Sequence, residues 1–370
     1  MRLSSRCAWG FPHPVAWEDA KVMSSSPLLP HLRRMVHVGP YGGELPVALR
    51  AAASVAVPML VLWATGHLEW SLYATFGAFT SLFGRTVPIR PRLVTQVQAG
   101  GVLVASVLVG TLLAVLGSAV PGTGWLVVPV AALWATGVAI LSHRLRWHPP
   151  GPLFPVFALG ACSSVPAGPE QLPVALAVAV AAVLFALVLT ACFARFEPGG
   201  PGTTALAAAP QTAPHAAPTP APGPEWTLSH YLVRYAPATA IGHPYWAMVA
   251  AVVPMSAPDA SGRILRAAQR LAGTLVGVVI AWALLAAAPP PLVVIAVAAL
   301  LQAGAELYVG RNYALAMLFI TPLALSMTHL AHPVPVSGLV SDRALDTVVG
   351  VAVAVVITLL THERRQDAEG

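Results

Sequence analysis

Long apolar segments are the feature that most limits what this sequence can fold into. Runs of roughly 20 apolar residues recur along the 370-residue chain, and about 20 such residues cross the hydrocarbon core of a bilayer. The chain is 57% hydrophobic and only 9% charged, with a mean hydropathy of +0.74, whereas soluble proteins are about 25% charged. So few charges cannot cover the surface of a soluble enzyme of this length. The sequence therefore predicts an all-α, polytopic membrane protein.

The sequence predicts twelve membrane spans, six on each side of a break. The spans are expected at residues 44–65, 69–84, 93–118, 123–142, 152–167, 171–194, 228–242, 244–258, 264–288, 291–309, 313–330 and 344–362. The break is rich in Pro, Ala and Gly and has no apolar periodicity, which is typical of a linker. The expected organisation, in chain order, is a polar N-terminal region, a first transmembrane half, the linker, a second transmembrane half and a short tail, at 1–43, 44–196, 197–225, 226–363 and 364–370.

The distribution of basic residues predicts the orientation. With a cytoplasmic N-terminus, 19 of the 20 Lys and Arg residues fall inside or at inner helix ends, and only Arg343 falls in an outer loop. Such an excess of basic residues marks the cytoplasmic side. No cleaved signal is predicted, because the first 40 residues lack an unbroken apolar run. We therefore expect a multi-pass protein of the plasma membrane with both termini and the linker in the cytoplasm.

The two halves also resemble each other in sequence. LVVPVAALWATG at 126–137 matches LVVIAVAALLQAG at 292–304 with one inserted residue, and other matches have separations near 170 residues. Because six is an even number, both copies would enter the membrane in the same sense. The prediction is two parallel repeats related by an axis along the membrane normal, with access alternating by rocking of one half against the other.

Several function classes are excluded by residue usage. The basic residues are scattered rather than gathered in the stripe that nucleic acid requires, and the single lysine, Lys21, does not belong to a P-loop. The three cysteines have no CxxC spacing, and the histidines form no metal-ligand pattern. We therefore expect neither an enzyme nor a bound cofactor or metal.

Three ordered motifs carry a family resemblance. They are HPYWAMVAAVVPMSAPDASGRILRAAQRLAGTLVG (243–277), RNYALAMLFITPLAL (311–325) and DRALDTVVG (342–350), and a degenerate copy, WSLYATFGAFTSLFGR followed by QVQAGG, stands in the first half. This pattern resembles the fusaric acid resistance (FUSC) family, also called the aromatic acid exporter family, over about residues 44–365. The resemblance implies an inner-membrane exporter of aromatic or other organic acids, coupled to protons or not. The expected partners are a small organic anion as substrate, protons, the lipid bilayer, and a second copy of the chain or a membrane-fusion protein.

Two other functions stay open from the sequence. Related plant proteins are anion channels, and the second alternative is a membrane scaffold of the envelope that transports nothing. The nearly apolar middle of each span favours a gated carrier over a channel with a continuous polar lining.

Arg263, Arg266 and Arg270 are the first candidate site residues. Their i, i+3, i+7 spacing places them on one helix face, where they could concentrate an organic anion at the inner mouth. Orientation signals are the alternative for Arg263 and Arg266, whereas Arg270 is expected inside the helix and thus closer to the substrate.

Acidic residues inside spans are the second set of candidates. Glu306 could carry a proton, because an intramembrane acid usually faces a cavity or a partner. It could instead form an ion pair with nearby Arg311. Asp346 and Arg343 are expected as a structural pair at the outer start of the last span, with a role in transport as the alternative.

The remaining candidates are polar or aromatic residues at helix starts and breaks. Thr321 precedes Pro322, which should bend its span and free backbone groups near a midplane site. Trp246 is either part of the aromatic belt or a stacking partner for substrate. Asn312 and Tyr313 belong to the RNY element, in which Asn312 is expected to cap the following helix.

Overall fold

The computed structural model describes residues 35, 37–85, 87–120, 122–149, 151–194, 244–255, 257 and 260–369. The chain divides into two units, residues 1–37 and residues 38–370, and the description below concerns the second. The predicted linker, the predicted span 228–242 and Arg195 lie outside the described residues.

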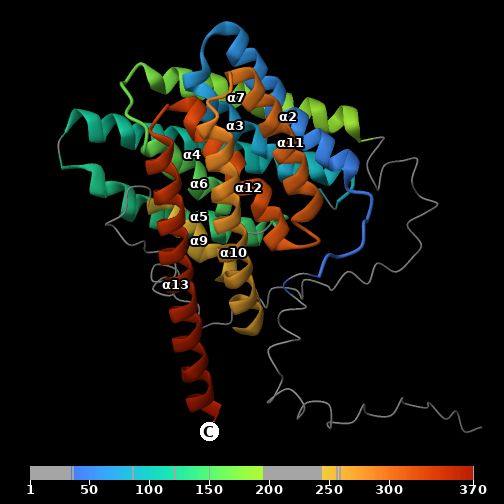
Figure 1. Ribbon diagram of the computed structural model, residues 1–370, viewed down its shortest axis with the longest axis vertical. Coiled ribbons are helices and arrows are strands. Elements are labelled where there is room, and N and C mark those ends of the chain that lie inside the picture. The colour runs from blue at the N-terminus through green and yellow to red at the C-terminus, as the bar shows by residue number, and fades with distance from the viewer. Residues whose placement is uncertain are drawn as a thin grey trace, which may run out of the picture. The chain divides into compact units, whose positions relative to one another are not determined.

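The described residues of the first half form helices joined by short turns (Figure 1). In chain order they are α2 (Leu45–Thr65), η2 (Leu68–Trp70), α3 (Ser71–Ala78), η3 (Phe79–Leu82), α4 (Ile89–Ala119), η4 (Gly124–Leu126), α5 (Val127–Arg144), α6 (Leu153–Ser163) and α7 (Gln171–Phe193). Helix α2 begins with a proline in its first turn and ends at Gly66, whose φ of 79° is accessible to glycine without strain.

The second half is also helical throughout its described residues. It contains α9 (Pro244–Met255), α10 (Ala260–Ala286), α11 (Pro291–Tyr308), α12 (Tyr313–Ala331) and α13 (Val336–Glu369). Every element found in the described ranges is a helix, which confirms the all-α prediction. Pro322 lies inside α12, which runs unbroken from Tyr313 to Ala331.

Eight of the described helices are long and apolar enough to cross a membrane. These are α2, α4, η4–α5, α7, α10, α11, α12 and the Val336–Leu360 part of α13. The segments expected at 69–84, 152–167 and 244–258 instead contain shorter helices, namely α3 with η3, α6 and α9. The protein is thus a multi-pass membrane protein.

The start of α13 corrects one prediction. The last span was expected to begin at residue 344, after an outer loop that contained Asp342 and Arg343. Helix α13 instead begins at Val336, because the apolar residues before Ser341 continue the helix. Arg343 and Asp346 therefore lie two to three turns inside a helix rather than at its start.

Helices in the two halves pack in similar pairs. In the first half α4 packs on α6 and α7, and α3 packs on α7; in the second, α10 packs on α12 and α13, and α9 packs on α13. Glycines permit the close approaches: a Cβ on Gly110 of α4 would meet α6, and one on Gly277 of α10 would meet Thr321 of α12. Small residues at helix contacts are typical of packing within membranes.

Several helix contacts join one half to the other. The largest is α2 against α11, and α6 with α9 and α3 with α12 are smaller. Aromatic rings add to the contact between α6 and α9, because Phe157 of α6 stacks on Tyr245 of α9 with ring centroids 5.7 Å apart.

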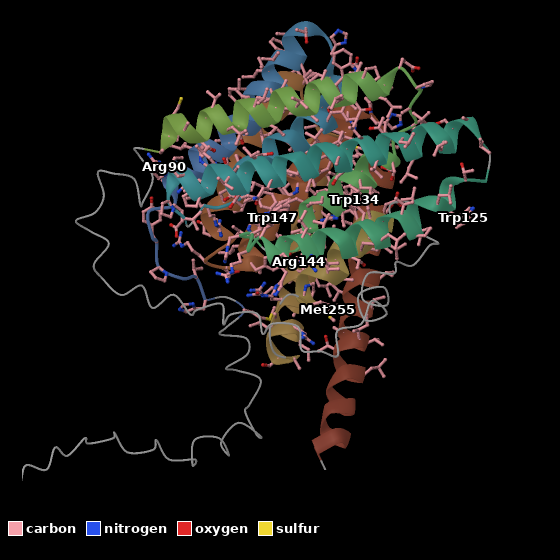
Figure 2. The ribbon with its side chains drawn as sticks, turned by 180° about the vertical axis from the view of Figure 1, so that it is seen from behind. Arg90, Trp125, Trp134, Arg144, Trp147 and Met255 are labelled. Carbon is pink, nitrogen blue, oxygen red and sulfur yellow. The ribbon has the colours of Figure 1, made fainter. Side chains whose placement is uncertain are left out.

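The packing of α2 on α11 gives the helices two recognisable ends. At one, here called the Glu69 end, a cavity of about 370 Å³ is lined by Leu68, Glu69, Pro289, Pro291, Val294, His329, Leu330, Ala331 and Pro333. At the other, the Arg85 end, residues 39–41 and 85 approach 306–311. Figure 2 shows Arg90 and Arg144 at the opposite end of the α4–α5 hairpin from Trp125.

Candidate functional site: a buried arginine cluster

Arg270 projects from α10 toward the start of α12. Its side chain is 2% exposed, and its Nη1 donates to the hydroxyl oxygen of Tyr313 at 2.6 Å. Two features fix this geometry: Tyr313 is the first residue of α12, and Gly273 lets α12 approach α10 one turn beyond Arg270. The structure thus brings together Arg270 and Tyr313, two residues singled out by separate motifs.

Arg343 lies on α13 and faces the same region. It is 2% exposed, and its guanidinium carbon stands 5.1 Å from the centroid of the Trp246 ring, within the range of a cation–π interaction. Arg270, Tyr245, Tyr313 and Asp346 all lie within electrostatic range of Arg343. We define the arginine cluster as Arg270, Arg343, Asp346, Trp246 and Tyr313, carried by α9, α10, α12 and α13.

Trp246 does not lie in an aromatic belt at the membrane surface, which is the simpler of its two expected roles. It was considered as part of an aromatic belt at the membrane surface, yet it is fully buried, with 0% exposure. Its ring contacts Tyr245 edge to face at 5.4 Å between centroids. Trp246 therefore forms a wall of the arginine cluster rather than an interfacial anchor.

Several polar atoms of the cluster make no hydrogen bond in the structure. They are Nε of Arg270, Nε and Nη1 of Arg343, and both carboxylate oxygens of Asp346. Asp346 is 0% exposed, and the expected structural ion pair with Arg343 is not among the ion pairs of the described residues. A buried ion costs several kcal/mol unless it is paired and hydrogen-bonded. Unused donors at this depth are what a binding site for an anion requires.

Thr321 and Thr274 extend this polar surface along α10 and α12. Both hydroxyls are buried without a hydrogen-bond partner, and Thr321 packs where α10 has Gly277. The two threonines add hydroxyl groups next to helix α10, one turn beyond Arg270 in the case of Thr274.

Glu306 is buried but lies in a different place. It is 8% exposed, and its Oε2 accepts a hydrogen bond from Nη1 of Arg85 at 3.2 Å, which forms an ion pair. Arg50 of α2 lies within electrostatic range as well. Glu306 therefore forms an ion pair, but with Arg85 rather than with the expected partner Arg311. The packing of α2 on α11 brings first-half arginines to Glu306.

Arg311 and Asn312 hold the turn between α11 and α12. The Nε of Arg311 donates to the carbonyl oxygen of Gly39 at 2.9 Å, and its guanidinium carbon lies 5.4 Å from the ring centroid of Tyr308. The Asn312 side chain accepts from the backbone N–H of Leu315 at 3.0 Å, the expected N-cap. Both residues shape the Arg85 end and lie outside the arginine cluster.

The three arginines of α10 differ in burial. They lie on one helix, but Arg266 is exposed, Arg263 is half-buried and Arg270 is buried. Arg263 also donates from Nε to the carbonyl oxygen of Ala257 at 3.0 Å. The row therefore leads from the surface toward the cluster.

Sequence reasoning did not select Arg50 and Arg85. Arg50 lies five residues inside α2, so it could have been noticed as a basic residue within a predicted span. Arg85 carried no such signal, because it stands among several arginines at the end of a segment and only tertiary packing pairs it with Glu306.

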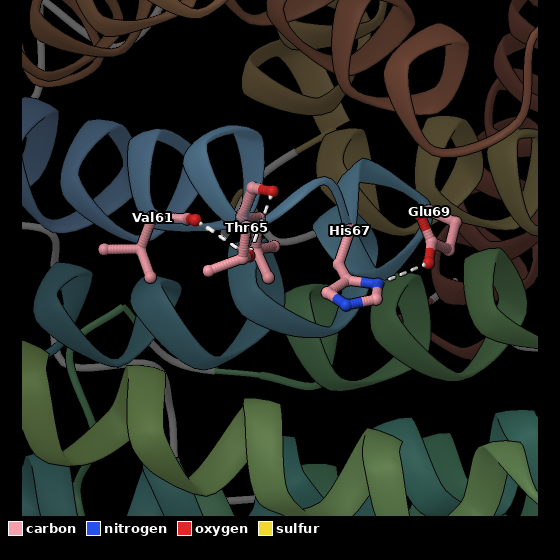
Figure 3. A network of polar contacts seen from close by, with 5 residues as sticks. Val61, Thr65, His67 and Glu69 are labelled. Atoms are coloured by element: carbon pink, nitrogen blue, oxygen red, sulfur yellow. Dashed lines mark hydrogen bonds and ion pairs between the residues drawn. The ribbon is translucent and has the colours of Figure 1, made fainter.

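The Glu69 end carries a separate set of titratable groups. Figure 3 shows His67 beside Glu69, with Nδ1 and Oε1 separated by 3.0 Å, and the His67 ring stacks on Trp70 at 4.0 Å between centroids. Glu69 and His329 both line the cavity at this end. Among the described residues, no three acidic, His or Cys side chains are grouped as metal ligands.

Comparison with known proteins finds a family match in the second half of the chain. The family model described as fusaric acid resistance protein-like matches residues 226–357, which include every residue of the arginine cluster. The membrane protein YvaC of Bacillus subtilis (strain 168) is 33% identical over 131 residues, which are 35% of this chain and 21% of YvaC. The chain thus spans about a fifth of the length of that relative. No solved structure matches.

The matched region contains the three motifs on which the family resemblance was based. Helix α2, the first-half helix that packs most extensively on it, has the length and hydropathy of a membrane helix. Residues 226–357 of this multi-pass membrane protein are therefore similar to the fusaric acid resistance protein-like family, which confirms the resemblance seen in this part of the sequence.

Proposed function

We propose that this protein is a plasma-membrane secondary transporter that exports small organic anions, with aromatic carboxylic acids as the leading class. The observation that carries the proposal is the pair of buried arginines, Arg270 and Arg343, whose N–H groups are only partly used. A carboxylate fits the planar guanidinium fork, and the Trp246 ring offers an apolar surface for the rest of the substrate.

The proposed architecture is twelve spans in two parallel repeats. The repeated pairing of α3, α4, α6 and α7 in the first half with α9, α10, α12 and α13 in the second supports it. Rocking of one half against the other would give alternating access. The contact of α2 with α11 means that these two helices must either slide against each other or move together.

The distribution of arginines is the basis for the proposed orientation in the membrane. The Arg85 end carries Arg85, Arg90, Arg92 and Arg311, so it should be cytoplasmic, as should both termini and the linker. In a cysteine-free background, an impermeant thiol reagent applied to intact cells should label Thr123→Cys, in the turn before α5, and should leave Pro214→Cys unlabelled. Labelling of the linker cysteine alone would reverse the proposed orientation.

Proton coupling is proposed to run through Glu306. Its carboxylate is held by Arg85, so it can accept a proton only in a state where that ion pair opens. Glu306→Gln should abolish export driven by a pH gradient while substrate exchange remains measurable. Gradient-driven export at the normal rate in this variant would make Glu306 a structural partner of Arg85.

The test of the function is uptake of labelled aromatic acids into inverted vesicles, with and without a pH gradient. Uptake is expected for the wild type, and Arg343→Gln should remove it. Arg144→Gln is the matched control, since Arg144 is an exposed arginine at the end of α5. Equal uptake by both variants would contradict the proposed site. A channel would instead pass the anions without accumulation against their electrochemical gradient.

A further inference from the structure

The arginine cluster has an unequal number of positive and negative charges. Arg270 and Arg343 contribute two positive charges, and Asp346 contributes one negative charge. All three are at most 2% exposed, so water cannot screen their charges as it does at a surface. With Asp346 ionised, the cluster carries a net charge of +1.

Other groups that face the cluster leave this count unchanged. Helix α9 contributes Tyr245 and Trp246, and helix α12 contributes Tyr313, all neutral side chains near neutral pH. Asp342, one turn before Asp346 on α13, lies within electrostatic range of Asp346, but it is half-buried, so water screens its charge and we do not count it in the enclosed cluster. Glu306 is paired with Arg85.

We propose that Asp346 sets the charge of the anion that this protein accepts, and that the site selects monoanions over dianions. One substrate carboxylate brings the cluster to zero net charge. A second carboxylate would leave an uncompensated negative charge in a region of low dielectric, which is strongly unfavourable. This inference rests on the proposed function, because it needs the cluster to be the substrate site.

The contacts of Asp346 support this role. A carboxylate that served only to hold Arg343 would be bonded to it, yet neither oxygen of Asp346 makes a hydrogen bond in the structure. Arg343 is positioned by other means, over the ring of Trp246. Asp346 therefore acts on Arg343 by its charge, and the guanidinium group stays open to a ligand.

The experiment compares benzoate with terephthalate, which share a ring and differ by one carboxylate. Full-length protein in proteoliposomes at pH 8, where both acids are fully ionised, would be assayed for exchange of labelled benzoate against each competitor. Wild type should bind benzoate at least about tenfold more tightly than terephthalate. Asp346→Asn raises the cluster charge to +2 and should shift the ratio of the two affinities toward terephthalate by about tenfold or more.

Two controls make the result interpretable. Asp346→Glu keeps the charge and should keep the preference for benzoate. Glu170→Gln removes one negative charge from an exposed position after α6 and should leave the ratio unchanged. Equal affinity of the wild type for the two acids would overturn the inference. So would a folded Asp346→Asn protein whose ratio of benzoate to terephthalate affinity stays within about twofold of the wild-type ratio.

The inference and the proposed function fail in different ways. If Arg343→Gln and Arg270→Gln both leave benzoate exchange intact, the cluster is not the substrate site and both ideas fail. If these variants lose exchange while Asp346→Asn keeps the wild-type ratio, the transport site stands and only charge selection by Asp346 is overturned.

Discussion

The buried arginines of the two halves differ in how their N–H groups are used. In the first half, Arg50 donates to the carbonyl oxygen of Ser81 at 2.6 Å and to Oγ1 of Thr190 at 3.2 Å. Arg92 donates to the carbonyl oxygens of Gly84 and Val87. In the second half, Arg343 has two nitrogens without a hydrogen bond, whereas Arg270 has one, as does Arg50 at Nη2.

Burial alone therefore does not distinguish a structural arginine from a ligand-binding one. Arg50 is 0% exposed and Arg343 is 2% exposed, and both lie inside helices that are long and apolar enough to cross a membrane. The first ties together α2, η3 and α7, whereas the second leaves donors open toward the helices around it. The use of the donors, rather than the presence of a charge in a span, identifies the candidate site.

The strongest test of this comparison replaces one arginine in each half with leucine. Arg50→Leu should lower the free energy of unfolding by about 3 kcal/mol or more, because each of the two charged hydrogen bonds contributes roughly 1.5–3 kcal/mol. Arg343→Leu should change stability little or raise it, since a buried charge without hydrogen bonds is replaced by an apolar group. Thermal unfolding in detergent measures both.

Transport should respond in the reverse sense. Arg343→Leu should lose anion exchange while remaining folded, and Arg50→Leu should keep its substrate affinity in the fraction that folds. Equal destabilisation by the two substitutions would mean that Arg343 is a structural residue like Arg50.

A smaller effect is expected at Arg270, which combines one hydrogen bond to protein with one open nitrogen. Arg270→Gln should weaken substrate affinity by about ten- to hundredfold, from the loss of a charge-assisted bond of roughly 1.5–3 kcal/mol. The loss should depend little on salt, because the group is buried. Arg270→Lys should restore only part of the affinity, since lysine keeps the charge but not the planar fork.

Tyr313→Phe provides the matched control for that result. It removes the hydroxyl that orients Arg270 but keeps both the charge and the ring, so its loss of affinity should be smaller than that of Arg270→Gln. Normal affinity in Arg270→Gln would exclude a direct contact between Arg270 and the substrate carboxylate.

The smallest effect is expected at Arg266, the exposed member of the row on α10. If it concentrates anions at the mouth, its influence is a field that salt screens over about 8 Å at physiological ionic strength. Arg266→Gln should raise the apparent KM several-fold at low salt and hardly at all at high salt, with little change in the maximal rate. A KM that is equally altered at both salt concentrations would indicate direct contact instead.

The helices were predictable from the sequence because hydropathy and helix-ending residues act locally. The observed ends of α2, α7 and α11 lie within a few residues of the expected ones. Helix α13 began earlier than expected, because Ser337 and Gly338 resemble a loop but are tolerated inside a membrane helix.

The partners of charged residues were harder to predict than the residues themselves. Arg270, Arg343 and Asp346 were selected as charged groups in or near spans, but their meeting depends on how α10 and α13 pack. Glu306 was matched with its sequence neighbour Arg311, whereas its partner is Arg85, far away in the chain. Contacts of this kind depend on tertiary packing, which a hydropathy pattern does not contain.

The packing of α2 on α11 has a consequence for biosynthesis. Residues 66–290 are made between these two helices, which at about 5–20 residues per second takes on the order of 10 to 45 seconds. During that time α2 resides in the bilayer without the helix that later covers it, and Arg85 has not yet formed its ion pair with Glu306. Assembly of the first half is therefore completed by a helix of the second, so an early termination of translation would leave an exposed helix face for membrane quality control to recognise.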